Sequence, residues 1–130
     1  MIAPYITSVI LSEHATEEEL TAARFAAAAP LAYYIGKMGV YYAQMLIRNG
    51  YGAEVEAVQE GWKQGMKSGI EAVSSELLDA TSIIGTPRQI VLKLDQWVAA
   101  GVDEPVLAIP SGTPDEAGPK LAALMQALKG

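Results

Sequence analysis

The sequence predicts an α/β fold built on parallel strands, and two features carry this prediction. Short apolar and β-branched runs, typical of buried strands, occur at Tyr5–Leu11, Ser82–Ile84 and Val106–Ile109. A Gly-Thr-Pro helix start follows the second run at Gly85 and the third run at Gly112, 27 residues later. Strands that alternate with helices in this way become parallel neighbours joined by right-handed crossovers, so the second and third strands are expected to pair.

Length and composition predict one domain over residues 1–130. The chain is 51% hydrophobic and 18% charged, which is enough apolar surface for a packed core. Its net charge of −6 has the wrong sign for holding phosphate backbones, so no nucleic-acid partner is expected. The absence of cysteine excludes disulfides, thiol catalysis, iron–sulfur clusters and cysteine-ligated zinc. The single histidine, His14, excludes sites with two imidazoles, and no metal site is predicted.

The first strand, Tyr5–Leu11, has no charge or proline in its interior. We expect it at an open edge of the sheet, where it would invite pairing with another chain. A helix follows, because Thr16 and Glu19 form a capping-box pattern and residues 17–19 are consecutive glutamates. Acids in a first turn stabilise the helix dipole more often than they bind a cation.

The middle of the chain predicts further helices. Pro30 is expected to begin a second helix, which runs to Arg48 and is apolar around most of its circumference. A third helix carries Val55, Val58 and Trp62 on one stripe.

Glycines weaken the helical pattern after this stripe. We expect a break near Gly65, followed by another short helical piece through Ile70 to Leu78.

Two helices in the last fifty residues are expected to bury apolar faces. The first begins at Pro87, with Thr86 and Gln89 as a capping box, and ends at Gly101. Its predicted buried face consists of Ile90, Val91, Leu94, Trp97 and Val98. The next strand, Val106–Ile109, is continuously apolar and is expected to be covered on both faces. The last helix is expected to bury Leu121, Leu124, Met125 and Leu128.

Residues 25–47 are long enough to span a bilayer and carry one charge, Lys37. A lysine near the middle of a span costs roughly 2.5–3.5 kcal/mol on insertion scales, and tyrosine prefers the membrane interface. A helix buried inside a protein explains the same residues better, so no membrane partner is expected. No secretory signal is visible at the start of the sequence, and the default expectation is a cytoplasmic location.

Several motifs, in their order and spacing, resemble one protein superfamily. They are Tyr41-Tyr42, Asn49-Gly50-Tyr51-Gly52, the helix of Trp62, Glu76-Leu77-Leu78-Asp79, Ile84-Gly85-Thr86-Pro87, the stretch Trp97 to Asp103 and the strand Val106 to Ile109. Together, over nearly the whole chain, they resemble the closing part of the luciferase-like monooxygenase superfamily. The resemblance implies an oxidoreductase built as a (βα)8 barrel that uses FMN or the deazaflavin coenzyme F-420.

For this chain the resemblance implies a partial (βα)8 TIM-type barrel with parallel strands and a helical insertion. A complete barrel takes about 250 residues, whereas this chain of 130 residues offers three convincing strands. We therefore expect a fragment or truncated member of the family that is not catalytically complete alone. Its partner would be another copy of itself or a separate N-terminal barrel part. The alternative is a non-catalytic, oligomerising binding module derived from such a barrel.

Candidate site residues lie where the strands end, because chemistry in a barrel collects at the carboxyl ends of its strands. Ser111, Gly112 and Thr86 are candidates for binding a cofactor phosphate at helix starts, although helix capping alone also explains Thr86. His14 could donate a proton or contact a flavin, and a solvated loop histidine is the alternative that we favour. No catalytic residue is assigned.

A tyrosine-rich stretch predicts an interface between chains. Its members at or beside the contact are Tyr34, Met38, Tyr41, Tyr42 and Met45. Large amphipathic rings are enriched where one chain meets another, although a core or a flavin-lining role would use the same residue types. We expect a homo-oligomer, most simply a two-fold dimer.

Overall fold

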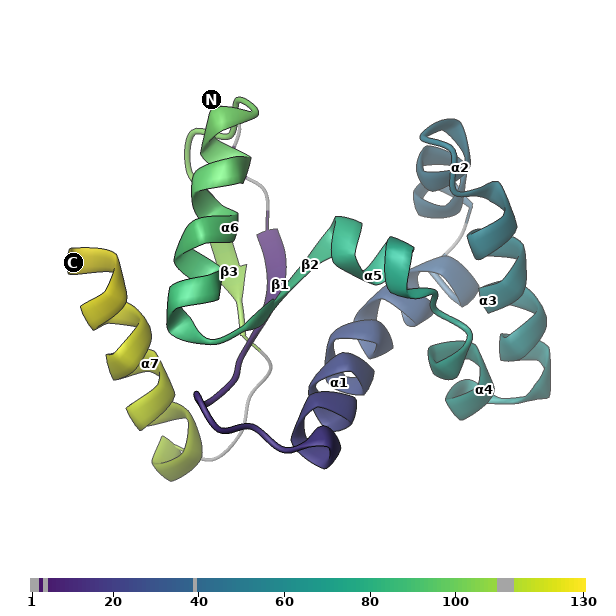
Figure 1. The fold of residues 1–130 in the computed structure, drawn as a ribbon. Coiled ribbons are helices and arrows are strands. Elements are labelled where there is room, and N and C mark those ends of the chain that lie inside the picture. Colours follow the sequence, from purple (N-terminus) through teal and green to yellow (C-terminus); the bar gives the residue numbers. More distant parts are fainter. Residues whose placement is uncertain (1–2, 4, 39, 110–113) are drawn as a thin grey trace. The chain divides into compact units, whose positions relative to one another are not determined.

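The computed structural model describes residues 3, 5–38, 40–109 and 114–130 (Figure 1). Over these residues the fold is α/β, with seven helices and a three-stranded parallel sheet, which confirms the predicted class. The chain folds as two compact units. Unit 1 contains Met1–Ala23 and Thr81–Gly130, and unit 2 contains Arg24–Ala80. The expectation of one domain over residues 1–130 stays a prediction.

The sheet of unit 1 consists of β1 (Tyr5–Ile10), β2 (Ser82–Gly85) and β3 (Val106–Ala108), in the order β2-β1-β3. Both pairings are parallel, with Thr7 opposite Ser82 and Tyr5 opposite Val106. The prediction that the first strand lies at an edge is therefore wrong, and so is the prediction that β2 and β3 are neighbours. The reason is that the connection from β2 to β3 crosses over β1, so β3 pairs with the other edge of β1 and not with β2.

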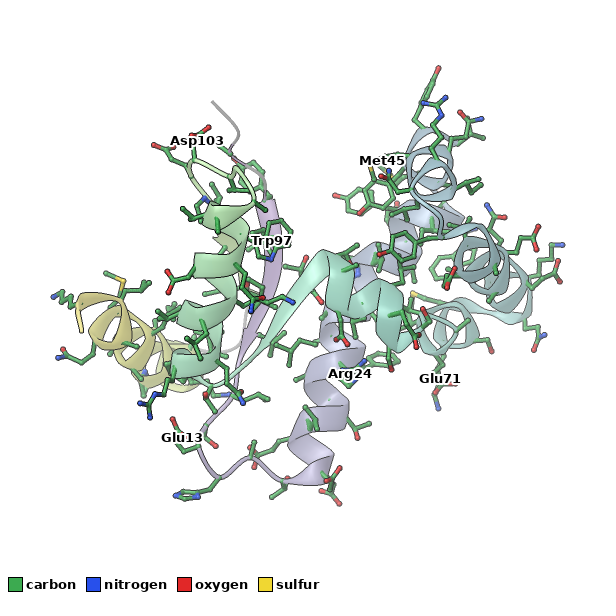
Figure 2. All side chains as sticks on the ribbon, turned by 45° about the horizontal axis from the view of Figure 1, so that its top comes forward. Glu13, Arg24, Met45, Glu71, Trp97 and Asp103 are labelled. Carbon is green, nitrogen blue, oxygen red and sulfur yellow. The ribbon has the colours of Figure 1, made fainter. Side chains whose placement is uncertain are left out.

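One face of this sheet forms the core of unit 1. Helices α6 (Pro87–Ala99) and α7 (Pro114–Lys129) pack on it (Figure 1). The buried cluster consists of Ile6, Ile10, Ile83, Ile90, Leu94 and Leu124, and partly buried Val91, Trp97, Leu107 and Ile109 join it. The labelled Trp97 in Figure 2 marks the α6 side of this core.

For both α6 and α7, the sequence predicted more buried residues than the structure shows. Val98 on α6 is exposed, and on α7 the exposed side chains are Leu121, Met125 and Leu128. Leu124 is the α7 residue in the core cluster. The physical reason is that α7 packs mainly on α6 and only marginally on β1, so a narrow stripe of α7 reaches the core.

The opposite face of the sheet carries no charged residue. Alternation along the strands places there Tyr5, Thr7, Val9, Ser82, Ile84, Val106 and Ala108. Ser82 is buried, Val9 and Ile84 are half-buried, and Tyr5 is 81% exposed. The expectation that the last strand is covered on both faces is wrong, because β3 is an edge strand with Val106 and Ala108 exposed.

Unit 2 is helical. Its elements are the larger part of α1 (Glu17–Gly36), then α2 (Tyr41–Arg48), α3 (Gly52–Gln64), α4 (Met66–Glu71) and α5 (Ser75–Thr81), which leads into β2. The helix predicted from Pro30 to Arg48 does end at Arg48, but its start and its continuity are wrong: α1 continues through Pro30 to Gly36, and α2 begins at Tyr41. The alanines on both sides of Pro30 favour helix strongly enough to offset the one donor that proline lacks.

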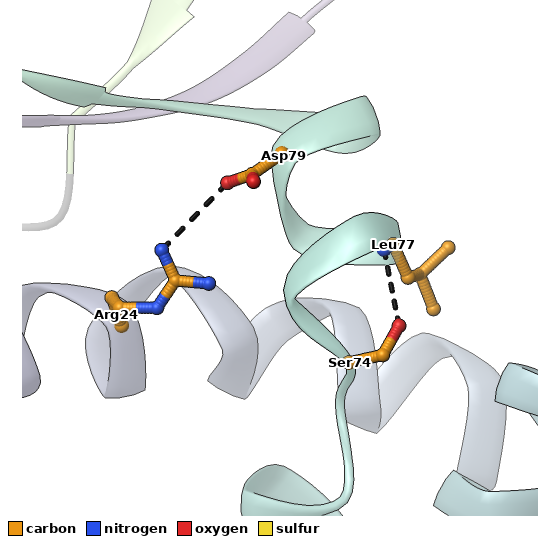
Figure 3. Close-up of polar contacts among 4 residues, drawn as sticks. All are labelled: Arg24, Ser74, Leu77 and Asp79. Carbon is orange, nitrogen blue, oxygen red and sulfur yellow. Dashed lines mark hydrogen bonds and ion pairs between the residues drawn. The ribbon is translucent and has the colours of Figure 1, made fainter.

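The breaks between the later helices have local causes. Gly65, with φ of 139°, separates α3 from α4, which confirms the predicted interruption there. The helical piece predicted from Ile70 to Leu78 is instead divided between α4 and α5. Ser74 starts α5, because its Oγ accepts a hydrogen bond of 3.1 Å from the Leu77 N–H (Figure 3).

An ion pair joins α1 to α5 within unit 2. Arg24 Nη1 lies 3.7 Å from Asp79 Oδ1 (Figure 3), and both side chains are substantially exposed. Exposed pairs contribute about 0–1 kcal/mol. Leu77 and Leu78 of α5 are buried, and burial of a leucine side chain contributes more, about 1.5–3 kcal/mol.

Trp62 on α3 packs against two glycines. A Cβ at Gly36, where α1 ends, would lie 2.8 Å from Cγ of Trp62, and a Cβ at Gly69 on α4 would overlap Cε3 of the same ring. These contacts leave no room for a side chain at either position. The predicted Trp62 stripe is confirmed in part, since Val55 and Val58 are fully buried and Trp62 is half-buried.

We expect Gly69→Ala to lower the free energy of unfolding by about 1–3 kcal/mol, because the added methyl group displaces the Trp62 ring. Denaturant titration followed by tryptophan fluorescence measures this loss. Gly52→Ala is the matched control, since a Cβ there meets its nearest atom at 3.9 Å. A control as destabilised as the Gly69 variant would contradict the steric explanation.

Candidate functional site

The carboxyl edge of the sheet brings two predicted site segments together. β1 and β2 are parallel, and the Leu11 N–H donates to the Gly85 carbonyl over 2.8 Å, so both strands end at the same edge. Thr86 follows β2 at this edge, and His14 lies in the turn that follows β1. Ligands of parallel α/β proteins bind outside the carboxyl ends of the strands.

Thr86 acts as a helix cap. Its Oγ1 accepts a hydrogen bond of 3.3 Å from the Gln89 N–H, and its own N–H donates to Gln89 Oε1 over 2.9 Å. Pro87 has no N–H, so the Arg88 N–H is the remaining first-turn donor of α6. The Gln89 side chain also covers Gly85, where a Cβ would lie 2.8 Å from Oε1. The capping explanation of Thr86 accounts for this geometry, and a phosphate would have to displace Gln89.

The other cofactor candidates, Ser111 and Gly112, lie outside the described residues. The described chain before them ends at Ile109, which is partly buried against the core of unit 1. Their assignment to a phosphate site stays a prediction.

His14 and the glutamates that follow it are exposed. The Ala15 N–H donates to the Ser12 carbonyl over 3.3 Å, and the Glu19 N–H donates to Thr16 Oγ1 over 3.1 Å, which caps α1 as expected. Over residues 3, 5–38, 40–109 and 114–130, no group of three or more acidic or histidine side chains is arranged to hold a metal ion. The exposure of His14 fits the solvated-loop alternative.

The predicted interface residues lie on α1, on α2 and between them. Tyr34, Met38, Tyr41 and Met45 are exposed, with Tyr41 at 85%, and Tyr42 is half-buried. The Tyr34 and Tyr42 rings are 5.6 Å apart with their planes tilted by 32°. The ring pair therefore connects α1 to α2.

Sequence reasoning missed two exposed apolar side chains in the same part of unit 2, Val40 and Ile47. Tyr33 is exposed as well, and the sequence had already indicated it, with the other tyrosines of this stretch, as an interface candidate. The Tyr33 ring meets the Tyr34 ring edge-on at 6.3 Å. The helix break after Gly36 exposes Val40, and no sequence pattern indicated that break.

A groove of about 840 Å³ in unit 2 was also missed. It is lined by Gly36, Lys37, Glu56, Gln59, Glu60, Trp62 and Lys63. Lys63 Nζ is paired with Glu60 Oε1 at 2.6 Å, so part of its charge is already neutralised. Trp62 Nε1 is buried and has no hydrogen-bond partner among the described residues.

Comparison with known proteins gives no relative: no family model, no curated protein and no solved structure matches the sequence. Among the described helices, none combines the length and apolar character that crossing a membrane requires.

Replacing Thr86 by Ala should lower the free energy of unfolding by about 1 kcal/mol, because the capping box that starts α6 is lost. Thr86→Ser keeps the accepting oxygen and should unfold like the wild type. Urea titration by circular dichroism compares the three proteins. Equal stability of the alanine and serine variants would contradict the cap as the role of this side chain.

Alkaline pH should weaken the fold through Tyr42. Burial, and then the neighbouring Tyr34, raise the pKa of Tyr42 above the ordinary value of 10.0. Below that pH, Tyr42 is neutral in both states; above it, the unfolded chain loses the proton first, and the free energy of unfolding falls. Tyr42→Phe should reduce this fall, whereas Tyr41→Phe, at an exposed ring, should retain it. Unfolding titrations across pH 9–11 decide between these outcomes.

Proposed function

We propose that this chain is the carboxyl-terminal part of a luciferase-like oxidoreductase barrel that depends on FMN or the deazaflavin F-420. We further propose that the chain is not catalytically complete alone and acts with a separate N-terminal barrel part, in the cytoplasm. The order of the sequence motifs supports the family. One structural observation supports the architecture, namely that the helices packed on the sheet of unit 1 lie on one face.

Two α/β architectures differ in which faces of the sheet are covered by helices. Doubly wound sheets carry helices on both faces, whereas a (βα)8 barrel carries helices outside and fills its interior with strand side chains. In unit 1, α6 and α7 pack on the face of Ile6 and Ile10, and the opposite face is uncharged. This arrangement supports the proposal that the sheet is part of a barrel wall. Its uncharged face would then point into the barrel, and the N-terminal barrel part would supply the other strands.

The observed strand order differs from the order expected in a complete (βα)8 barrel, so the proposal includes one rearrangement of the strands. Consecutive strands of a (βα)8 barrel are neighbours, whereas here β3 pairs with β1. We propose that a strand of the missing part takes this edge of β1 and that β3 then pairs with β2. The three-residue length of β3 limits the hydrogen bonds that such an exchange breaks.

The described residues do not by themselves fit a flavin phosphate. At the start of α6, the N–H groups of Thr86 and Gln89 are bonded within the capping box, and Pro87 has none. Hydride transfer would be the chemistry of the cofactor, and the protein would supply a closed cleft around it. Three strand ends do not supply such a cleft, so the proposed contribution of this chain is part of the barrel wall.

A second candidate function is a non-catalytic binding module that oligomerises. The exposed tyrosine and methionine side chains of α1 and α2 favour it, because an isolated monomer rarely exposes so many large apolar groups together. This candidate needs no cofactor and no N-terminal barrel part.

The pure chain should show no saturable, substrate-dependent oxidation of reduced FMN or reduced F-420. Co-expression with the N-terminal part of a luciferase-like barrel should yield a complex that retains the visible absorbance of the cofactor after gel filtration. Oxidation of the reduced cofactor by the chain alone would contradict the proposal that its site is incomplete. Failure to associate with any such barrel part would remove the first proposal and leave the binding module.

A further inference from the structure

The groove of unit 2 has room for a small molecule. Its volume of about 840 Å³ lies within the range of roughly 300–1,000 Å³ that small-molecule sites occupy. Gly36 and Lys37 line it from the end of α1, and Trp62 lines it from α3 together with a row of polar side chains. All of these residues belong to unit 2, so the groove is formed within one compact unit.

The indole ring of Trp62 has its pyrrole side toward the groove. A Cβ at Gly36, which lines the groove, would lie 2.8 Å from Cγ and 2.9 Å from Cδ1, and both atoms belong to the pyrrole ring. The benzene side of the indole lies instead against Gly69, which does not line the groove. Nε1 is bonded to Cδ1, so this nitrogen lies on the side of the ring that borders the groove.

Trp62 Nε1 is a hydrogen-bond donor without an acceptor. The atom is buried, and none of the described residues accepts a hydrogen bond from it. An indole nitrogen can only donate, and an unpaired buried donor destabilises the protein because it has lost its contact with water. A molecule in the groove that offers an oxygen to this N–H would remove that loss.

Four charged side chains line the groove, and two of them are unpaired. Lys63 Nζ lies 2.6 Å from Glu60 Oε1, so these two side chains neutralise each other. Lys37, on the α1 side, and Glu56, on the α3 side, take part in no ion pair among the described residues. An anion alone would meet the like charge of Glu56, and a cation alone would meet that of Lys37. A molecule that carries both charges can pair with both side chains.

We propose that this groove binds a small zwitterion, a molecule with one carboxylate and one ammonium group, as in an amino acid. The carboxylate accepts hydrogen bonds from Trp62 Nε1 and Lys37 Nζ, and the ammonium group donates to the Glu56 carboxylate. The inference depends on neither candidate under Proposed function, because the groove uses neither the sheet nor the exposed tyrosines. Its test therefore needs no flavin and no barrel partner.

The two tryptophans of the full chain give a direct readout by ¹H–¹⁵N NMR. Trp97 belongs to the core of unit 1, so its indole N–H signal is the internal control, and Trp97→Phe identifies the Trp62 signal without changing the groove. Glycine or γ-aminobutyrate should move the Trp62 signal downfield with saturation, because a carboxylate is a strong acceptor. Butyrate and butylamine, with one charge each, should bind about tenfold more weakly or worse. No shift with either zwitterion, or equal binding of butyrate, would overturn the proposal.

Neutral variants test the two charged contacts. Lys37→Gln and Glu56→Gln should each weaken γ-aminobutyrate binding by about tenfold, whereas Glu56→Gln should not weaken butyrate binding. Lys67→Gln is the matched control, because Lys67 is exposed on α4 and lies outside the groove. All three positions are exposed, so the variants are expected to fold. Wild-type affinity in the Glu56 variant, or equal losses in the Lys37 and Lys67 variants, would also overturn the proposal.

Discussion

The parallel pairing of β1 with both of its neighbours is the constraint on which unit 1 depends. β1 comes from the start of the chain, whereas β2 and β3 come from its second half. In the sequence, the whole of unit 2 separates β1 from β2. Ile6 and Ile10 form a core with Ile83 only because the register of β1 and β2 places them on one face. Without this pairing, α6 and α7 would lose the apolar sheet face that they cover and the stabilisation that its burial provides.

Unit 2 depends on a different kind of fit, the packing of an indole ring against backbone. Trp62 occupies the space where side chains would stand at Gly36 and Gly69, so α1 can end beside α3 and α4 can return against it. Close packing of this kind tolerates little change in volume. α1 ends at Gly36, beside this ring, and the exposed Met38 and Val40 follow before α2 begins at Tyr41. The tight packing around Trp62 and the candidate interface therefore meet at the end of α1.

The candidate features of the two units differ. In unit 1 the N–H groups of Thr86 and Gln89 at the start of α6 are used in the capping box, and the sheet face opposite α6 and α7 carries no charged residue. In unit 2 the candidate interface consists of exposed tyrosine and methionine side chains.

The sequence by itself determined the local features: three strands, the capping box of Thr86 and Gln89, and the break at Gly65. Each depends on residues a few positions apart, whose backbone preferences and hydrogen bonds are set locally. Only the tertiary structure decided that β1 is central, that α1 passes through Pro30, and that the apolar stripe of α7 reaches the core through Leu124. These outcomes depend on which distant surfaces meet, and apolar periodicity shows that a face can be buried without showing what buries it. For the same reason the tyrosines could be recognised as interface candidates, whereas Val40 and Ile47 became visible beside them only after the helix break was known.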